Sequence, residues 1–167
     1  MDIDLTLLTG FGSEETFVDG FLQSYEARRP DARSFALQNR VLLLRHPSGV
    51  GIDIALGALP FEESAVHRAV VIEVEPRAKI RLCTAEDLIV MKAFADRPID
   101  WKDISGVIVR QGESALDWRY ISQHLKPLCE AKEQPDILDR LEALRREVRL
   151  RSENKTLATA ESANRRP

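Results

Sequence analysis

Two aspartates near the start of the chain have a spacing that suits metal binding. Asp2 and Asp4 alternate with Ile3 and Leu5 in the run Met1–Leu8. Alternate side chains of a β-strand lie on one face, so both carboxylates would point the same way and the apolar residues would point into a core. Neighbouring carboxylates repel each other and are costly to desolvate, and a divalent cation such as Mg²⁺ removes that cost. The other interpretation is the solvent-facing side of an edge strand.

A third acid repeats this pattern later in the chain. Asp53 stands between Ile52 and Ile54 in the apolar run Val50–Leu56. A carboxylate flanked by β-branched residues is expensive to bury without a partner. Asp53 is therefore either a third metal ligand or a solvent-facing residue that stabilises a strand or turn.

One lysine interrupts an otherwise apolar helix. The stretch 85–96 is apolar nearly all round, which is typical of a buried helix. At 3.6 residues per turn Lys92 lies among Ala85, Leu88 and Ile89, with Asp96 one turn further on. Two interpretations stay open: Lys92 extends from an apolar surface into solvent, or it points into a cleft that holds anions. In the second case its partners without nucleotide would be Asp2, Asp4, Asp53 or Asp96.

The elements that would position these residues follow from hydrophobic periodicity and turn residues. The patterns predict an α/β (α+β) fold, with a mixed sheet and helices over 1–83. From Thr84 the pattern is helical, and we expect a helical part over 84–150 that packs on the first part, followed by a disordered tail over 151–167. The expected elements of the first part are strands at 1–8, 35–45, 50–56, 70–75 and 80–83 and a helix at 14–27.

Composition limits the class of protein. The chain has 167 residues, 44% hydrophobic and 31% charged, which is ordinary for a globular protein. A net charge of −3 gives no general attraction for nucleic acid. Cys83 and Cys129 match no metal or redox spacing, and no signal peptide or membrane span is evident. We expect a cytoplasmic protein without a membrane partner.

Three stretches together suggest a family. They are D-I-D at 2–4, G-I-D-I-A-L at 51–56 and E-D-L-I-V-M-K-A-F-A-D-R-P-I-D-W-K-D at 86–103. Over about 1–130 the chain resembles the nucleotidyltransferase superfamily related to DNA polymerase beta, and more closely its AbiEii-type, toxin-associated branch. The resemblance implies a nucleotidyltransferase-like fold and transfer of a nucleoside monophosphate from an NTP to an acceptor, which would be a protein, a tRNA or a small molecule. It also implies a cognate antitoxin protein as a partner.

The resemblance assigns roles to seven residues. Two divalent cations, Mg²⁺ or Mn²⁺, would activate the acceptor oxygen and clamp the triphosphate. For Asp100 and Asp103 the competing roles are helix capping, with Asp100 as the cap, and a surface ion pair. The implied ligands of the metal are Asp2, Asp4 and Asp53, the phosphate contact is Lys92, and Arg97, Asp100 and Asp103 would shape the far side of the cleft.

The chain also departs from the family pattern. Family members carry a Gly-Ser element upstream of the D-x-D motif, which holds the triphosphate through backbone N–H groups and a hydroxyl. Here the D-x-D motif begins at residue 2. Three explanations stay open: a start codon further upstream, a shortened chain, or a remnant that does not transfer nucleotides.

Other functions compete with this one. A catalytically degenerate interaction protein of a toxin–antitoxin pair is the main alternative. Asp53 with Glu73 and Glu75 also faintly resembles the acidic pattern of restriction-type nucleases, although Glu75 stands where a lysine is needed. The four bases at 145, 146, 149 and 151 would either contact RNA or form a solvated helix face balanced by nearby glutamates. The three histidines are scattered and indicate no zinc site.

Overall fold

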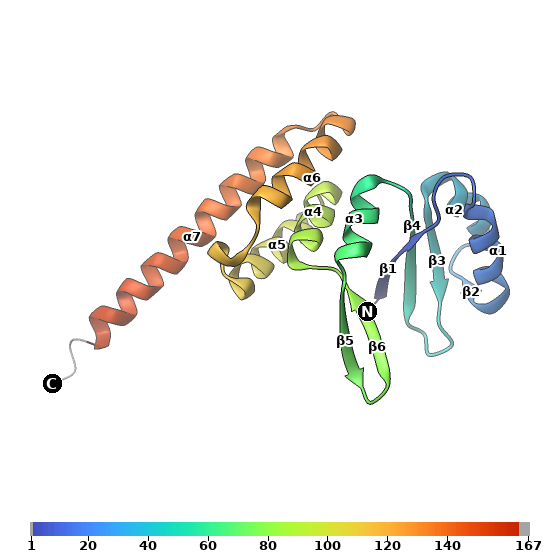
Figure 1. Ribbon diagram of the computed structural model, residues 1–167, viewed down its shortest axis with the longest axis horizontal. Helices are drawn as coiled ribbons and strands as arrows, with labels where there is room; N and C mark the ends of the chain where they lie inside the picture. The colour runs from blue at the N-terminus through green and yellow to red at the C-terminus, as the bar shows by residue number, and fades with distance from the viewer. Residues whose placement is uncertain (1, 164–167) are drawn as a thin grey trace. The chain divides into compact units, whose positions relative to one another are not determined.

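The structure is a computed structural model that describes residues 2–163 and the side chains of residues 2–154 (Figure 1). The chain forms two compact units, residues 1–71 and 72–167. The first contains β1 (Asp2–Leu8), α1 (Glu14–Ser24), β2 (Glu26–Ala27), α2 (Ala32–Asn39), β3 (Val41–Arg45), β4 (Gly51–Gly57) and α3 (Pro60–Arg68).

The second unit is mainly helical. The hairpin strands β5 (Val70–Glu75) and β6 (Ala78–Leu82) form a separate two-stranded sheet, and β5 crosses the boundary between the units. After Thr84 the described residues form helices and no strand. These are α4 (Ala85–Ala95), α5 (Pro98–Gln111), the 3₁₀ helix η1 (Glu113–Ala115), α6 (Trp118–Ala131) and α7 (Asp136–Ala163).

The larger sheet is mixed, which confirms the predicted α/β class. Its strand order is β1-β4-β3-β2, with β1 parallel to β4 and the other neighbours antiparallel. β1 is therefore an edge strand. The hairpin of β3 and β4 around Pro47 and Gly49 is present where turn residues predict it.

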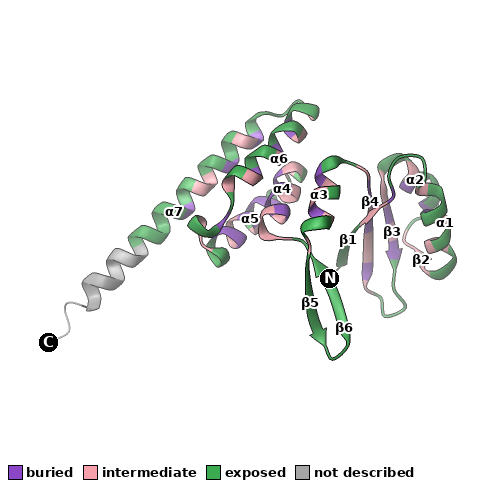
Figure 2. Cartoon of the chain, in the orientation of Figure 1, coloured by how far each residue is buried: buried purple, intermediate pink, exposed green. Residues whose placement is uncertain are grey.

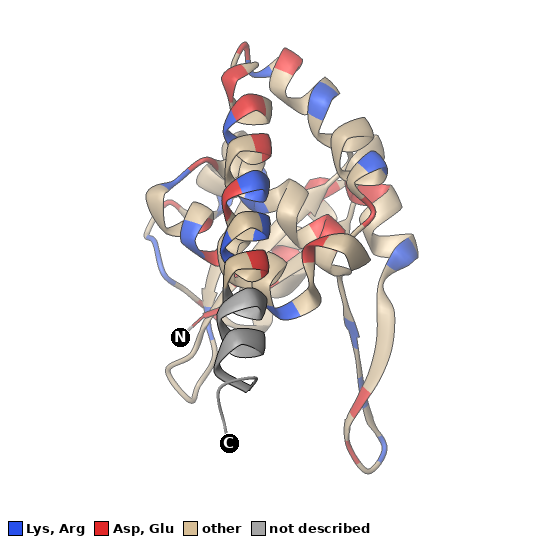
Figure 3. Cartoon of the chain, turned by 90° about the vertical axis from the view of Figure 1, so that its left-hand side faces the viewer, with Lys and Arg blue, Asp and Glu red and all other residues tan. Residues whose placement is uncertain are grey.

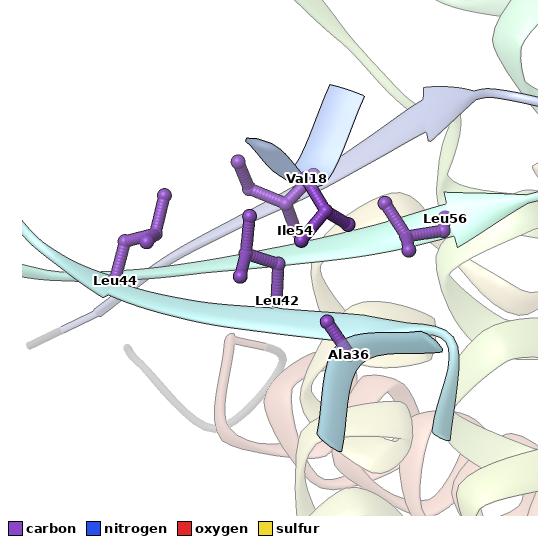
Figure 4. Close-up of a cluster of buried hydrophobic side chains, with 6 residues drawn as sticks. All are labelled: Val18, Ala36, Leu42, Leu44, Ile54 and Leu56. Atoms are coloured by element: carbon purple, nitrogen blue, oxygen red, sulfur yellow. The ribbon is translucent and has the colours of Figure 1, made fainter. Parts of the chain in front are cut away.

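One face of this sheet carries the core of the first unit. Residues of β3 and β4 point toward α1 and α2, as the close-up shows (Figure 4). Alternation places every second residue of each strand on this side. The fully buried members are Val18, Ala36, Leu42, Leu44, Ile54 and Leu56.

The predicted strand over 35–45 is wrong in its first half. Residues 32–39 form α2, and β3 begins only at Val41, after Arg40 in the left-handed conformation (φ 54°). Ala32 and Ala36, one helical turn apart, are both buried. The helix is stabilised because these two alanines are buried in the folded unit. This burial outweighs the strand preference that residues 35–40 share with the apolar run after them.

In the second unit α4 packs against α5, α6 and α7. Ile89, Val90 and Ala93 are fully buried, as expected for a helix that is apolar nearly all round. The hairpin of β5 and β6 is exposed along its whole length (Figure 2). Across residues 2–163, every helix is too short or too polar to span a lipid bilayer.

The end of the chain differs from the sequence-based expectation. α7 continues through Ala163, so residues 151–163, for which composition predicts disorder, are helical. The remainder of the predicted tail, 164–167, lies outside the described residues.

Candidate functional site

The parallel pairing of β1 and β4 brings two predicted site residues side by side. Asp4 is in register with Asp53, and Asp2 with Gly51. Residues in register on neighbouring strands point to the same face, and Asp2 shares that face with Asp4 because it is two residues away. The core residues Ile52 and Ile54 point to the other face. The three carboxylates thus lie on one side of the sheet, which we call the acid face.

The acid face is covered by α3 only at one end. A β-carbon added at Gly57 would lie 3.5 Å from the Glu62 β-carbon and 3.1 Å from a Thr6 methyl, so α3 packs near the ends of β1 and β4. The strand positions of Asp2, Asp4 and Asp53 are nearer the other end. Asp2 and Asp4 are exposed and Asp53 is partly exposed, which leaves their carboxylates accessible to a ligand.

An arginine that sequence patterns did not single out lies between the acids. The guanidinium of Arg28 donates through Nη2 to Asp53 Oδ1, and its Nη1 is 3.7 Å from Asp2 Oδ2. The Arg28 and Asp53 side chains are 23% and 31% exposed, so the pair is only partly screened by water. Asp4, by contrast, makes no side-chain hydrogen bond or ion pair within the described residues.

The lack of a side chain at Gly51 makes room for this arrangement. A β-carbon there would lie 2.6 Å from Asp2 Oδ1 and 3.1 Å from Arg28 Nη1. Such distances are shorter than van der Waals contact, so any other residue would push Asp2 or Arg28 aside. Glycine is needed at position 51 because the side chains of Asp2 and Arg28 come close to its backbone, and not because of an unusual backbone conformation.

The donor set of the acid face suits a hard divalent cation. Three carboxylates supply oxygen ligands of the kind that Mg²⁺ and Mn²⁺ prefer. As the side chains stand, however, no group of three or more His, Cys, Asp or Glu residues in the part of the chain that the structure describes is arranged to hold a metal ion. Arg28 contacts two of the three acids, so a cation that uses both of them would have to share these carboxylates with a positively charged guanidinium.

The other candidate residues form a second cluster, on α4 and α5. Lys92 Nζ donates to Asp103 Oδ2 at 2.7 Å and lies 3.4 Å from Asp100 Oδ1. Within its own unit, Lys92 is thus paired with Asp103 and Asp100 and not with Asp96, the partner predicted one helical turn away. Asp96 ends α4 in the left-handed conformation and accepts hydrogen bonds from Trp101 and Arg140 instead.

Asp100 is the centre of this second cluster. Its carboxylate is fully buried and accepts from the Arg97 backbone at 3.2 Å and from the Arg97 guanidinium at 2.6 and 3.0 Å. The predicted capping role is corrected in one detail. Arg97 occupies the N-cap position and Pro98 the first turn, while Asp100 reaches back to the cap from the third helical position.

Charges in this cluster hold each other in the ionised form. The hydrogen bonds from Arg97, only partly opposed by burial, lower the pKa of Asp100 below its usual 3.8. Burial lowers the pKa of Lys92, but the hydrogen bonds and charges of Asp103 and Asp100 outweigh it and raise the pKa above 10.5. Lys92 therefore carries a positive charge at neutral pH.

The remaining candidate residues are engaged elsewhere. Glu73 accepts from the Arg77 backbone in the small hairpin sheet, whereas Asp53 belongs to the larger sheet. Basic and acidic residues alternate along α7 (Figure 3). They pair as Arg145 with Glu113 and Glu142, Arg149 with Glu153, and Arg151 with Glu147.

No protein-family model matches the chain, and no curated protein matches its sequence.

Proposed function

We propose that this chain is a metal-dependent nucleotidyltransferase that transfers a nucleoside monophosphate from an Mg-NTP to an acceptor. The observation that carries the proposal is the acid face, where Asp4 and Asp53 lie in register on parallel strands and Asp2 lies on the same side. Three carboxylates from two neighbouring strands are a suitable ligand set for one or two hard cations. A nucleotidyltransferase-like fold is part of the proposal.

Each residue has a role that follows from its charge. Bound Mg²⁺ or Mn²⁺ would supply activation of the acceptor oxygen and neutralisation of the leaving pyrophosphate. Asp2, Asp4 and Asp53 hold the cations. Lys92, kept protonated by Asp103 and Asp100, offers a point charge to a phosphate. Arg97, Asp100 and Asp103 shape the surface around that ammonium.

Labelled nucleotides test the activity. The chain is incubated with each α-labelled NTP, Mg²⁺ and a cell extract, and label is followed onto protein, RNA and small molecules. Asp53→Asn should reduce transfer by roughly 100-fold or more, because metal clamping contributes several kcal/mol. The matched control is Asp19→Asn, an acid on α1 paired with Arg33, which should transfer normally. Equal labelling by the Asp53 variant would refute the metal role.

A second variant tests the phosphate contact. Lys92→Met keeps the side-chain stem and removes the charge, while buried Asp100 keeps its bonds to Arg97. We expect Mg-NTP binding to weaken about tenfold or more, the value of one charge-assisted contact, with the fold intact by circular dichroism. Unchanged nucleotide affinity together with a large fall in melting temperature would make Lys92 a structural ion-pair residue.

A non-catalytic interaction protein of a toxin–antitoxin pair is the alternative function. Internal partners already contact the candidate catalytic groups, since Arg28 pairs with Asp53 and Asp103 pairs with Lys92. Calorimetric titration with Mg-NTP separates the two functions. The enzyme binds the nucleotide through Asp53 and Lys92, whereas the interaction protein shows no binding that depends on these residues.

A further inference from the structure

Arg28 belongs to a row of residues that crosses the sheet. β2 pairs Ala27 with Leu44, and the next backbone bond joins Arg28 N–H to Leu43 O at 3.0 Å. Leu43 is in register with Asp53, and Asp53 is in register with Asp4. The row therefore runs from Arg28 across β3 and β4 to Asp4. Backbone pairing fixes the base of the Arg28 side chain, while its guanidinium reaches the acids.

The guanidinium is imperfectly satisfied where it lies. Its two terminal nitrogens face Asp53 and Asp2, but Nε is buried and has no hydrogen-bond partner. A buried donor without a partner costs free energy. This position is therefore less favourable than one in which every N–H group of the guanidinium has an acceptor. A position that exposes Nε to water or to a phosphate oxygen would recover that cost.

The acid face keeps negative charge even with Arg28 in place. Arg28 is paired with Asp53 and Asp2, whereas Asp4 has no ion pair within the described residues and keeps its negative charge uncompensated. A divalent cation is attracted to this surface but meets Arg28 at Asp53 Oδ1. A cation bound at Asp53 would lie beside the guanidinium, and the two positive charges would repel each other.

We propose that Arg28 is an internal counter-ion that competes with divalent metal for the acid face and is displaced when metal binds. This inference rests on the proposed function, because it takes the three acids as the metal ligands. Arg28 neutralises Asp53 and Asp2 in the metal-free protein. Metal binding breaks the pair with Asp53 and releases a guanidinium suited to bidentate contact with the triphosphate.

Mn²⁺ affinity of the intact protein, without nucleotide, tests the competition. Mn²⁺ binding is measured by electron paramagnetic resonance and calorimetry for the wild type and four variants. Arg28→Met should bind Mn²⁺ roughly tenfold more tightly, because a partly buried pair no longer has to be broken. Arg28→Lys keeps the charge but loses the bidentate guanidinium, so its Mn²⁺ affinity should rise about threefold.

Two further variants are the controls. Asp53→Asn should lose Mn²⁺ binding. The matched control Arg33→Met removes an exposed arginine paired with Asp19 and Glu15, and it should bind Mn²⁺ as the wild type does.

The outcomes separate this inference from the proposed function. If Arg28→Met and Arg28→Lys bind Mn²⁺ no more tightly than the wild type, while Asp53→Asn loses it, the competition is refuted and the metal site stands. If no variant binds Mn²⁺, or Asp53→Asn binds normally, both proposals fall. Far-UV circular dichroism checks the fold of each variant, and Arg28→Lys alone decides the question if Arg28→Met does not fold.

Discussion

Asp53 and Lys92 are each neutralised by a residue that is remote in sequence or on another element. Arg28 is 25 residues from Asp53, and Asp103 is on the helix after that of Lys92. Partly buried pairs of this kind resist screening better than surface pairs do. Any ligand that uses these groups must therefore exchange one ion-pair partner for another.

The buried carboxylate of Asp100 predicts a defined pH dependence of stability. Because hydrogen bonds from Arg97 lower its pKa in the folded state, Asp100 contributes stability that is present above the unfolded-state pKa near 3.8. That contribution is lost as pH falls through the lower folded-state pKa. The free-energy difference between wild type and Asp100→Asn should thus be constant above about pH 5 and shrink below about pH 4.

Urea denaturation at intervals from pH 3 to pH 6 measures this difference. Arg97→Gln serves as the companion variant, because it removes the largest cause of the lowered pKa of Asp100. In this background the free-energy difference should change less between pH 3 and pH 6. Stability curves of wild type and Asp100→Asn that stay parallel down to pH 3 would contradict the assignment.

Sequence could predict the acid face but not what neutralises it. The period of two along β1 places Asp2 and Asp4 together, and Asp53 repeats the same local pattern. Arg28 follows a strand of only two residues, and its contact with Asp53 depends on the register of β2, β3 and β4. Asp103 was visible as a charged residue near Lys92, yet its contact depends on the turn at Asp96, where the helix direction changes.

At the scale of elements, the sheet has one apolar face and one mixed face. β3 shows this most clearly, because Leu42 is fully buried in the core while its neighbour Leu43 is half-buried on the side of Asp53. A continuous apolar run in the sequence hides this difference, since all three leucines at 42–44 look equivalent.

Alanine substitutions on β3 test which face is the core. Leu42→Ala should lower the free energy of unfolding by about 2–5 kcal/mol, through lost burial and the cavity left between the sheet and α2. Leu43→Ala should cost about 1 kcal/mol or less, because its side chain fills no closed space. Chemical denaturation of both variants gives the comparison, and equal losses would mean that the strand is buried on both faces.

α4 was more predictable from sequence than α2. The stretch 85–96 is long and apolar nearly all round, and the Thr84 hydroxyl caps it by accepting from Asp87 N–H at 3.2 Å. α2 has eight residues and shows too few turns for its buried alanine face to stand out beside the leucines of β3. Its helical state depends on burial of Ala32 and Ala36 that only the folded unit provides.

At the scale of the whole molecule, the chain passes from one compact unit to the other within a strand of an exposed hairpin. The boundary falls after Val71, inside β5, and both hairpin strands are exposed throughout. A two-stranded hairpin without a packed face is marginally stable by itself. Its valines and isoleucines make no core, so the hairpin is the segment in which local opening costs the least.

Limited proteolysis should therefore cut the chain first in this hairpin, after Arg77, six residues beyond the boundary between the units. This residue forms the hairpin tip with Pro76, has a positive φ of 71° and is exposed, whereas Lys79 and Arg81 lie within β6. Trypsin cleaves exposed tips faster than paired strands, which must open before they fit the protease. One fragment keeps the whole first unit and the other keeps the helices α4 to α7 of the second, so both should persist as bands after the cut. Arg77→Gln removes the tip site and should slow the appearance of both bands roughly tenfold, since cleavage at Lys79 or Arg81 requires strand opening.

A first internal cut within residues 2–68 or 85–150, or an unchanged rate for Arg77→Gln, would show that the hairpin is not the weakest connection in the chain.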